Sequence, residues 1–383
     1  MKIFKCQNCG NTLHFNNDVC LKCRYRVGYL DELFEMSALT LVGDQMRPFA
    51  NPDRLYIFCE NASKAACNWL VPADSGESFC LACRYNLTIP DLSVPDNHER
   101  WQKIEQAKKH LFYSLTRFEL PIPSRMDNMD PGLAFEFLAD VEAADGTMEN
   151  VLTGHADGLI SINIVEADDA ERERRRTAMG EPYRTLIGHF RHEVGHFYWD
   201  LLIRDGGRLD SFRALFGDPD EDYAAALQRH YENGAPFDWR DNFISAYASA
   251  HPWEDFAETW AHCFHMVDGL ETARAFGITP EFQFDANTTA PFDPSFDPYY
   301  STNIKPVIAS WIPLTVAINS VNRSLGQPDF YPFVITNKVI TKIDFVLRLI
   351  VSAQKEQDHA EFSAPPRMTE QDVSSAEQFL QNV

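Results

Sequence analysis

The chain has 383 residues, of which 45% are hydrophobic, so it is long enough to bury a large core in about two domains. Its formal net charge of -22 argues against nucleic acid or anionic lipid as the main partner, because like charges repel. A basic or neutral peptide meets no such repulsion. The composition therefore indicates a globular protein and favours a peptide or protein over nucleic acid or a membrane as its partner.

The cysteines and the first residues predict a cytoplasmic location. The stretch Met1–Cys6 has no apolar signal core, and we expect no apolar run long enough to span a bilayer. Eight of the nine cysteines lie before residue 84 at metal-ligand spacings, whereas Cys263 stands alone. Reduced thiolates on zinc, in a reducing compartment, explain this distribution better than disulfides do.

Residues 1–92 are predicted to form a double zinc-ribbon domain. Each CxxC turn presents two thiolates from one tight loop, and a second pair completes a tetrahedron. The run CLKCRY at 20–25 is repeated as CLACRY at 80–85, which indicates a duplication. Sites closed by protein ligands leave no position for water, so these zinc ions should be structural. The first site is expected from Cys6, Cys9, Cys20 and Cys23, and the second from Cys59, Cys67, Cys80 and Cys83.

The next elements lead into a catalytic domain expected over residues 97–354. Prolines and Asp91 mark a linker at 90–95, and Asn97 is expected to cap a helix over 98–117. Strands are predicted at 134–141 and 158–165. Isoleucines alternate with polar residues in the second strand. This strand could be a sheet edge on which an extended peptide lies, and an ordinary strand within the sheet is the alternative.

The most informative stretch is HEVGH, at 192–196, within a helix predicted over 181–204 that starts with Pro182. Histidines four residues apart on a helix place both imidazoles on one face, where one Zn²⁺ can bind them. We expect His192 and His196 to be zinc ligands and Glu193 to be the general base.

The third zinc ligand must come from elsewhere, and two schemes fit the sequence poorly. A histidine six residues after His196 would complete a metzincin site, but Leu202 stands there and Trp199 replaces the required glycine. An aspartate ligand would have to be Asp200 or Asp210, and neither lies in a glycine-threonine context.

The stretch HPWEDFAETWAH at 251–262 is a better source of the third ligand. Pro252 suits a helix start, and Glu254 and Glu258 then share one face of the helix. This spacing lets Glu254 bind the metal while Glu258 accepts a hydrogen bond from a ligand imidazole. An exposed acidic helix face is the alternative interpretation.

Beyond this helix the sequence is less informative. His262 and His265 are expected to be hydrogen-bonded histidines in or near the core, and Cys263 a buried apolar residue. The proline- and aspartate-rich segment 277–303 is expected to be a lid, a wall of the binding site or disordered. Helices are predicted at 304–325 and 338–353. Residues 355–383 are a polar tail with a short helix from Thr369 to Leu380.

Together, HEVGH and the later ExxxE resemble the motifs of gluzincins, and EDFAE resembles the corresponding helix of lethal-factor-like peptidases. That resemblance implies that Tyr247, seven residues before Glu254, stabilises the oxyanion. The whole chain resembles the bacterial zinc-ribbon-containing, zinc-binding metallopeptidases. The expected fold is α+β: the zinc ribbon, then a mostly helical zincin-like domain with a small sheet.

The expected function is a zinc-dependent peptidase with one catalytic and two structural zinc ions. Water on a catalytic zinc has a pKa of roughly 7, so Glu193 can take its proton during attack on a peptide carbonyl. Tyr247 or His251 could bind the developing oxyanion. Two alternatives remain: an adaptor whose ribbons bind proteins and whose metal site is inactive, and a hydrolase acting on a small amide. The sequence leaves substrate specificity and oligomeric state open.

Overall fold

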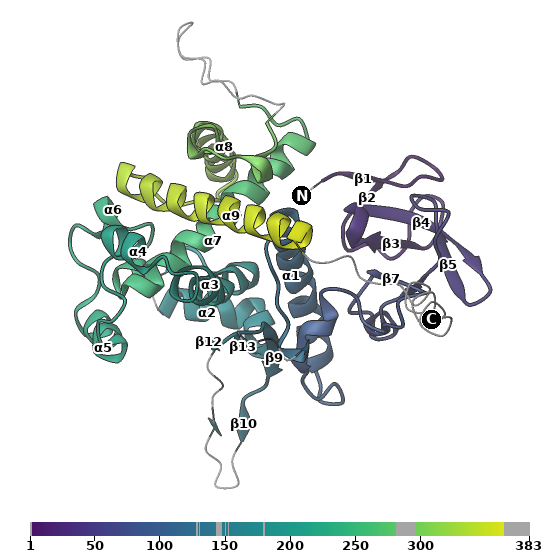
Figure 1. Cartoon of the computed structure of the whole chain (residues 1–383), viewed down its shortest axis with the longest axis horizontal. Coiled ribbons are helices and arrows are strands. Elements are labelled where there is room, and N and C mark those ends of the chain that lie inside the picture. Colours follow the sequence, from purple (N-terminus) through teal and green to yellow (C-terminus); the bar gives the residue numbers. More distant parts are fainter. Residues whose placement is uncertain are drawn as a thin grey trace, which may run out of the picture.

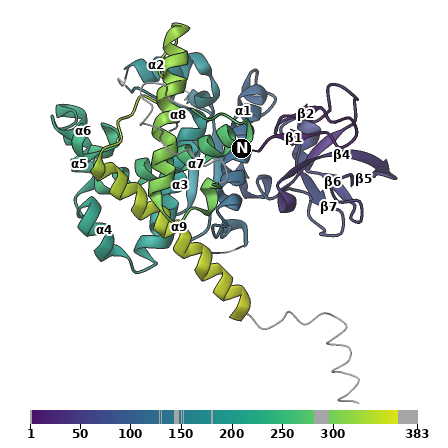
Figure 2. The same ribbon diagram turned by 90° about the horizontal axis from the view of Figure 1, so that it is seen from above.

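The computed structural model describes residues 2–127, 129, 131–142, 148–149, 151, 153–178, 181–280 and 296–363. A strand-rich N-terminal part lies beside a larger helical part, and helix α1 (Asn97–Arg117) stands between them in both ribbon views (Figures 1 and 2). This arrangement confirms the predicted α+β fold, with a ribbon followed by a mostly helical domain.

The N-terminal part consists of a hairpin and a five-stranded antiparallel sheet. The hairpin pairs β1 (Phe4–Lys5) with β2 (Thr12–Leu13). The sheet has the order β3-β4-β5-β6-β7, so each strand pairs with the next one along the chain. Its strands are β3 (Val27–Leu30), β4 (Glu35–Val42), β5 (Gln45–Pro48), β6 (Tyr56–Phe58) and β7 (Leu70–Pro72), with 3-10 turns at Asp31–Leu33, Glu60–Lys64 and Cys83–Tyr85.

A second sheet has four strands in the order β12-β13-β9-β8. Strand β9 (Ala134–Leu138) runs parallel to both β8 (Asn86–Thr88) and β13 (Leu159–Asn163), and β12 (Gly154–Ala156) pairs antiparallel with β13. Of the two interpretations of the strand at 158–165, the ordinary strand within the sheet is correct, because β12 lies outside it. A separate hairpin joins β10 (Val141–Glu142) and β11 (Met148–Glu149).

The helical part is organised around α3, which packs along α7 (Figure 1). A π-helical turn, Asp200–Arg204, continues α3, and 3-10 turns lie at Arg125–Asp127, Ile164–Ala167, Tyr247–Ser249 and Pro298–Tyr300. No helix was predicted from the sequence at the positions of α2, α4 or α6. The helices after α1 are α2 (Asp169–Ala178), α3 (Leu186–Trp199), α4 (Leu209–Phe216), α5 (Tyr223–Asn233), α6 (Trp239–Asn242), α7 (Pro252–Ala275), α8 (Ile304–Ser324) and α9 (Asn337–Ser363).

Two predicted helix starts were wrong. Helix α3 begins at Leu186 rather than at Pro182, because the Thr185 hydroxyl accepts a hydrogen bond from the Gly188 amide and caps the helix there. At α1 the capping residue is Asp96, in the left-handed conformation, and its side chain makes no capping bond. The Asn97 side chain instead donates to the Asp91 carbonyl.

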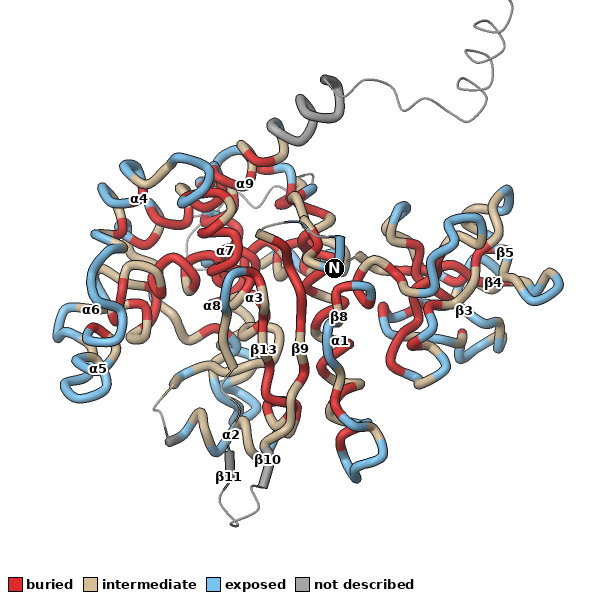
Figure 3. Tube along the Cα trace, turned by 60° about the horizontal axis from the view of Figure 1, so that its bottom comes forward, coloured by how far each residue is buried: buried red, intermediate tan, exposed pale blue. Residues whose placement is uncertain are grey.

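One continuous cluster of buried side chains runs from Phe4 in the ribbon to Ala353 in α9. Figure 3 shows this buried layer passing through α3, α7, β9 and β13. Polar contacts also tie the ribbon to α1, since Lys109 donates to Asn68 and the Asn68 amide donates to Phe15. The ribbon is thus packed against the helical part as one body.

Helix α8 is long and apolar enough to cross a membrane by length and composition alone, so the expectation that no such run exists was wrong. In the structure, 44% of the apolar 18-residue stretch within this helix is buried, and the helix packs on α7 and α9. The core helix of a soluble protein passes the same test, so this feature is weak evidence for a membrane span.

Two predicted segments lie wholly or partly outside the described residues. These are the centre of the 277–303 segment and the short helix from Thr369 to Leu380. Helix α9 continues to Ser363, beyond the residue 353 at which we predicted its end and into the predicted polar tail.

Candidate functional site

The site forms where α3 and α7 approach closely at Gly195. A Cβ atom at this position would lie 3.0 Å from the Ala257 Cα and 3.2 Å from the Trp260 Cβ, so only glycine permits the contact without a shift. The close approach brings one face of α3 against the N-terminal half of α7. It thereby places the two histidines of α3 opposite the two glutamates of α7.

Three side chains from these helices point their ligand atoms at one another. The His192 Nε2 lies 3.0 Å from Glu254 Oε2 and 3.1 Å from His196 Nε2. The distance from His196 Nε2 to Glu254 Oε2 is 3.4 Å. Ligand atoms about 2.0–2.1 Å from a tetrahedral zinc lie about 3.3–3.4 Å apart. Glu254 Oε2 is buried without a hydrogen-bond partner among the described residues. This group of two nitrogens and one oxygen could therefore hold a zinc ion and leave one position open.

Glu258 orients the His192 ring. One Glu258 oxygen lies 2.8 Å from His192 Nδ1, and the other accepts a 2.6 Å hydrogen bond from the Ser245 hydroxyl. Burial favours the neutral acid, but the interaction with His192, with smaller effects from His262 and Ser245, lowers the pKa of Glu258 to about 2. The ionised carboxylate keeps the proton of His192 on Nδ1, so Nε2 is the nitrogen available to a metal.

Tyr223, at the start of α5, performs a similar task for Glu254. Its hydroxyl donates a 2.5 Å hydrogen bond to Glu254 Oε1, which leaves Oε2 as the atom facing the histidines. The Asp222 side chain caps α5, and the Glu221 carbonyl lies 3.1 Å from His251 Nε2. Sequence reasoning missed Tyr223 and Ser245, because neither has a fixed spacing from the motifs that it supports.

Replacing Tyr223 by phenylalanine tests this contact. Tyr223→Phe leaves a buried carboxylate oxygen without its donor, and groups that orient metal ligands typically contribute about 10- to 100-fold to metal affinity. We expect the zinc at this site, and no other zinc, to dissociate at correspondingly lower concentrations of a chromophoric chelator. Tyr231→Phe is the control, since Tyr231 is 63% exposed on the same helix. Equal zinc retention in both variants would contradict the assignment.

Glu193 follows His192 directly on α3, and Tyr247 lies near the His192 ring. Glu193 is half-buried on α3, and burial raises its pKa despite the opposing charges of His192 and His196. The Tyr247 ring centroid is 5.9 Å from that of His192. Burial and the Glu254 charge raise the pKa of Tyr247 far above its usual range, so its hydroxyl keeps its proton.

His251 was the other candidate for binding the oxyanion, and the structure gives its nitrogens different tasks. As the residue that caps α7, it accepts a 3.1 Å hydrogen bond from the Trp253 amide at Nδ1. Its Nε2 faces the Glu221 carbonyl. The Tyr247 hydroxyl makes no hydrogen bond within the described part of the chain, so no partner there engages its proton.

Aromatic residues form the wall beside His196. The Trp253 ring lies over the imidazole at a centroid distance of 3.7 Å. The His155 ring of β12 is roughly parallel to the imidazole at 6.1 Å, so the edge strand runs next to the ligand residues. Sequence reasoning gave no role to either side chain. Their contacts restrict the His196 ring and exclude water from one of its sides.

The eight N-terminal cysteines gather into the two predicted groups of four. The sulfur atoms of Cys6 and Cys23 are 3.6 Å apart, those of Cys9 and Cys20 3.7 Å, and those of Cys67 and Cys80 3.6 Å. Thiolates about 2.3 Å from a tetrahedral zinc lie about 3.8 Å apart, whereas a disulfide bond is about 2.05 Å long. Both groups therefore fit closed zinc sites made of free cysteines.

The second cysteine group is buried and lies against α1. All four of its members are buried, whereas Cys9 and Cys23 of the first group are partly exposed. The Cys83 sulfur lies 3.6 Å from a carboxylate oxygen of Glu105 on α1, and this glutamate is paired with the buried Lys108. A zinc ion in this group would therefore support the packing of the ribbon on the helical part.

The remaining candidates on α7 lie away from the ligand atoms. His262 Nδ1 is 2.8 Å from the Tyr331 hydroxyl, and His265 contacts Arg191. Cys263 is buried, and burial raises the pKa of its thiol to about 12, so it stays a neutral, apolar group. These positions agree with the expectation that none of the three is a metal ligand.

Comparison with known proteins identifies a family for each of the two parts of the chain. Residues 97–349 match the family described as "Putative zinc-binding metallo-peptidase", and residues 3–94 match a family of zinc-ribbon domains. Uncharacterized proteins of Mycobacterium bovis and of two Mycobacterium tuberculosis strains are each 40% identical over 348 residues, which cover 90% of this chain and 94% of theirs. No solved structure matches significantly. The chain therefore belongs to the family described as "Putative zinc-binding metallo-peptidase", with a zinc ribbon at its N-terminus.

Proposed function

We propose that the protein is a zinc-dependent peptidase whose catalytic zinc is bound by His192, His196 and Glu254. The observation that supports this most directly is the convergence of their three ligand atoms, with Glu193 beside them. A site that only stores or senses zinc has no need of a general base next to an open position. Family membership favours the same reading.

Each side chain has a distinct task in this proposal. His192, His196 and Glu254 would hold the zinc ion, which would supply Lewis acidity to the substrate carbonyl and lower the pKa of water to about 7. Glu193 accepts the proton of the attacking water and passes it to the leaving amine. Tyr247 donates its hydroxyl proton to the oxyanion in a hydrogen bond. Glu258 and Tyr223 hold the ligand side chains in place.

The substrate we propose is an extended peptide paired with β12. This strand ends the sheet order β12-β13-β9-β8, so its outer edge has no strand partner among the described residues. Its central residue, His155, faces His196. A peptide hydrogen-bonded to this edge would pass beside the ligand residues, and main-chain pairing would position its scissile bond with little demand on side-chain identity.

The two cysteine groups are proposed to hold structural zinc, which gives three ions per chain with the catalytic one. Because the free thiols lie at ligand spacing, we propose that the protein works in a reducing compartment such as the cytoplasm. The partner in this proposal is a peptide or protein, and neither nucleic acid nor a membrane takes part.

A peptide library tests the proposal. The zinc-loaded full chain is incubated with the library, and new termini are identified by mass spectrometry, with Glu193→Gln under the same conditions. Cleavage by the wild type that is absent from the variant supports the peptidase. If the wild type cleaves nothing while its three zinc ions are bound, the adaptor is the better reading.

Tyr247→Phe separates oxyanion binding from packing. The variant keeps the ring against His192 and loses only the hydroxyl. We expect kcat to fall about 100- to 1,000-fold, as for other single oxyanion donors, with KM and zinc content close to wild type. Steady-state kinetics on a peptide found in the library give both constants. Tyr231→Phe is the control here too, and a variant with wild-type kcat would show that Tyr247 only packs.

A further inference from the structure

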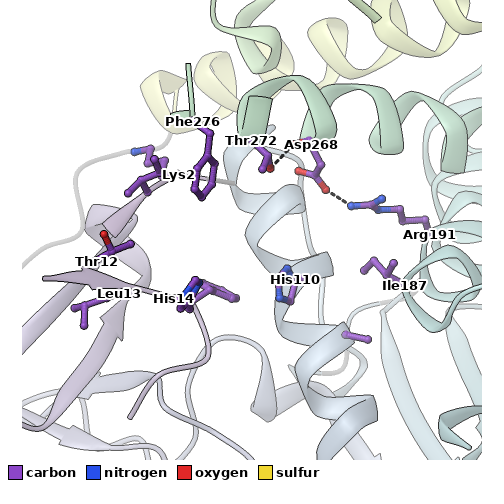
Figure 4. Close-up of a pocket in the computed structure, with 13 residues that line it drawn as sticks. Lys2, Thr12, Leu13, His14, His110, Ile187, Arg191, Asp268, Thr272 and Phe276 are labelled. Carbon is purple, nitrogen blue, oxygen red and sulfur yellow. Dashed lines mark hydrogen bonds and ion pairs between the residues drawn. The ribbon is translucent and has the colours of Figure 1, made fainter. Parts of the chain in front are cut away.

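A cavity of about 460 Å³ lies between the ribbon and the helical part, and none of the three ligand residues lines it. One wall comes from the β1–β2 hairpin and the residues next to it, and the other comes from α1, α3 and the end of α7. Figure 4 shows His14 of the ribbon facing His110 of α1 across the opening, with Lys2 and Phe276 at its upper end. The cavity exists only because the two parts are packed together.

The walls of this cavity are mainly apolar. Ribbon residues Ile3, Leu13 and Phe15 face Ala107, Ile187 and Phe276 from the helices. Cavities of roughly 300–1,000 Å³ with apolar walls and a few polar groups are typical of small-molecule sites. The volume and the lining both favour a ligand with an apolar body.

The charged groups at this cavity are mostly basic, in a chain whose formal net charge is -22. Lys2 and Arg191 line it, and Asp268 is the one carboxylate among the lining residues. That carboxylate is already engaged: it is paired with Arg191, accepts a 2.7 Å hydrogen bond from Ser114, and accepts another from Tyr299. The ammonium of Lys2 lies 5.5 Å from the Phe34 ring centroid and forms no ion pair within the described part of the chain, although its charge partly offsets the rise that burial causes in the pKa of Glu35.

His110 adds a neutral polar group. Its ring packs edge-on against Phe15 at 4.9 Å, and burial lowers its pKa to about 4. At neutral pH the ring therefore has one donor nitrogen and one acceptor nitrogen. No hydrogen bond to either nitrogen is formed by the described residues, so both are available to a molecule in the cavity.

We propose that this cavity binds a small amphiphilic carboxylic acid, whose carboxylate pairs with Lys2 and whose apolar chain lies between the ribbon and the helices. Leu13 and Phe276 contact the chain in this arrangement, and His110 offers a hydrogen bond to a polar substituent. Ile187 and Arg191 belong to α3, which also carries the HEVGH motif. Such a ligand would touch both the ribbon and the metal-binding helix and would stabilise their packing.

Decanoate serves as the probe, titrated calorimetrically into the zinc-loaded full chain. We expect saturable binding of one decanoate per chain. Decylammonium and decan-1-ol should bind about tenfold more weakly or worse, because they lack a charge that pairs with Lys2. Lys2→Glu should weaken decanoate binding by at least about tenfold. Lys5→Glu is the matched control with unchanged affinity, because the exposed Lys5 lies nearby on β1 and does not line the cavity.

A second variant fills the cavity. Ala107→Trp places a large ring in the space for the apolar chain, and we expect it to abolish binding while zinc content and peptide cleavage stay at wild-type levels. The proposal is overturned if decanoate shows no saturable binding, if the three probes bind equally, or if Lys2→Glu and Lys5→Glu have the same affinity. Unchanged binding by a folded Ala107→Trp protein would overturn it as well.

Discussion

Glu193→Gln is expected to remove peptide cleavage while the protein keeps its fold and its zinc. Glutamine has nearly the same shape as glutamate, but its amide cannot accept the proton of an attacking water. Positioned general bases typically contribute about 100- to 10,000-fold, so we expect kcat to fall by that factor with a nearly unchanged KM. The measurement is the rate of cleavage of one peptide from the library, together with zinc content by atomic emission.

The control for this substitution is Glu173→Gln, a change of the same kind at an exposed position on α2. It should keep full activity and about three zinc ions per chain, as the ligand sets require. If Glu193→Gln cleaves as fast as the wild type, Glu193 is not the base. If it loses a zinc ion, the variant has disturbed the site, and its rate says nothing of proton transfer.

The sequence predicted the helices that carry the candidate site well, because their signals are local. Four-residue spacing fixes which side chains share a helical face, so His192 and His196, and likewise Glu254 and Glu258, could be paired from the sequence alone. The two-residue spacing within each CxxC pair is an equally local signal. Gly195 permits the close approach of α3 and α7, but the sequence does not show which distant segment packs against this glycine.

Contacts between segments far apart in the chain could not be predicted from the sequence. Tyr223 precedes Glu254 by 31 residues, and nothing in its neighbours marks it as the donor to that carboxylate. The alternating isoleucines of β13 correctly indicate one buried face, but alternation does not reveal which strands lie alongside. The three-residue strand β12 has no pattern of its own, so the sequence could not show that β12, rather than β13, forms the edge.

The wrong start of α3 shows how two valid signals compete. Pro182 and Thr185 are each common at helix starts. Before Thr185 the chain is held by other contacts: Arg184 pairs with Glu181 and Glu166, and the Glu181 carbonyl accepts a hydrogen bond from Arg176. These interactions involve α2 and the turn before it, so a sequence window around the HEVGH motif could not include them.

Cys80→Ala is expected to have the largest effect on stability. It removes one thiolate from the fully buried group, and structural zinc in such sites contributes roughly 10–16 kcal/mol of apparent binding free energy. We expect about two zinc ions per chain instead of three. The loss should extend beyond the ribbon, because Cys83 contacts Glu105 of α1 and the core is continuous through that helix. Thermal unfolding and limited proteolysis should show early exposure of residues 1–92.

Cys263→Ala is the matched control, because this cysteine is also buried but lies on α7 outside both groups. Losing a sulfur from the core should cost about 1 kcal/mol and leave all three zinc ions bound. Three zinc ions in Cys80→Ala would contradict the second site, and two in Cys263→Ala would mean that its thiol is a ligand. Comparing Cys80→Ala with Cys263→Ala therefore separates the effect of losing a metal site from the effect of losing a buried sulfur atom.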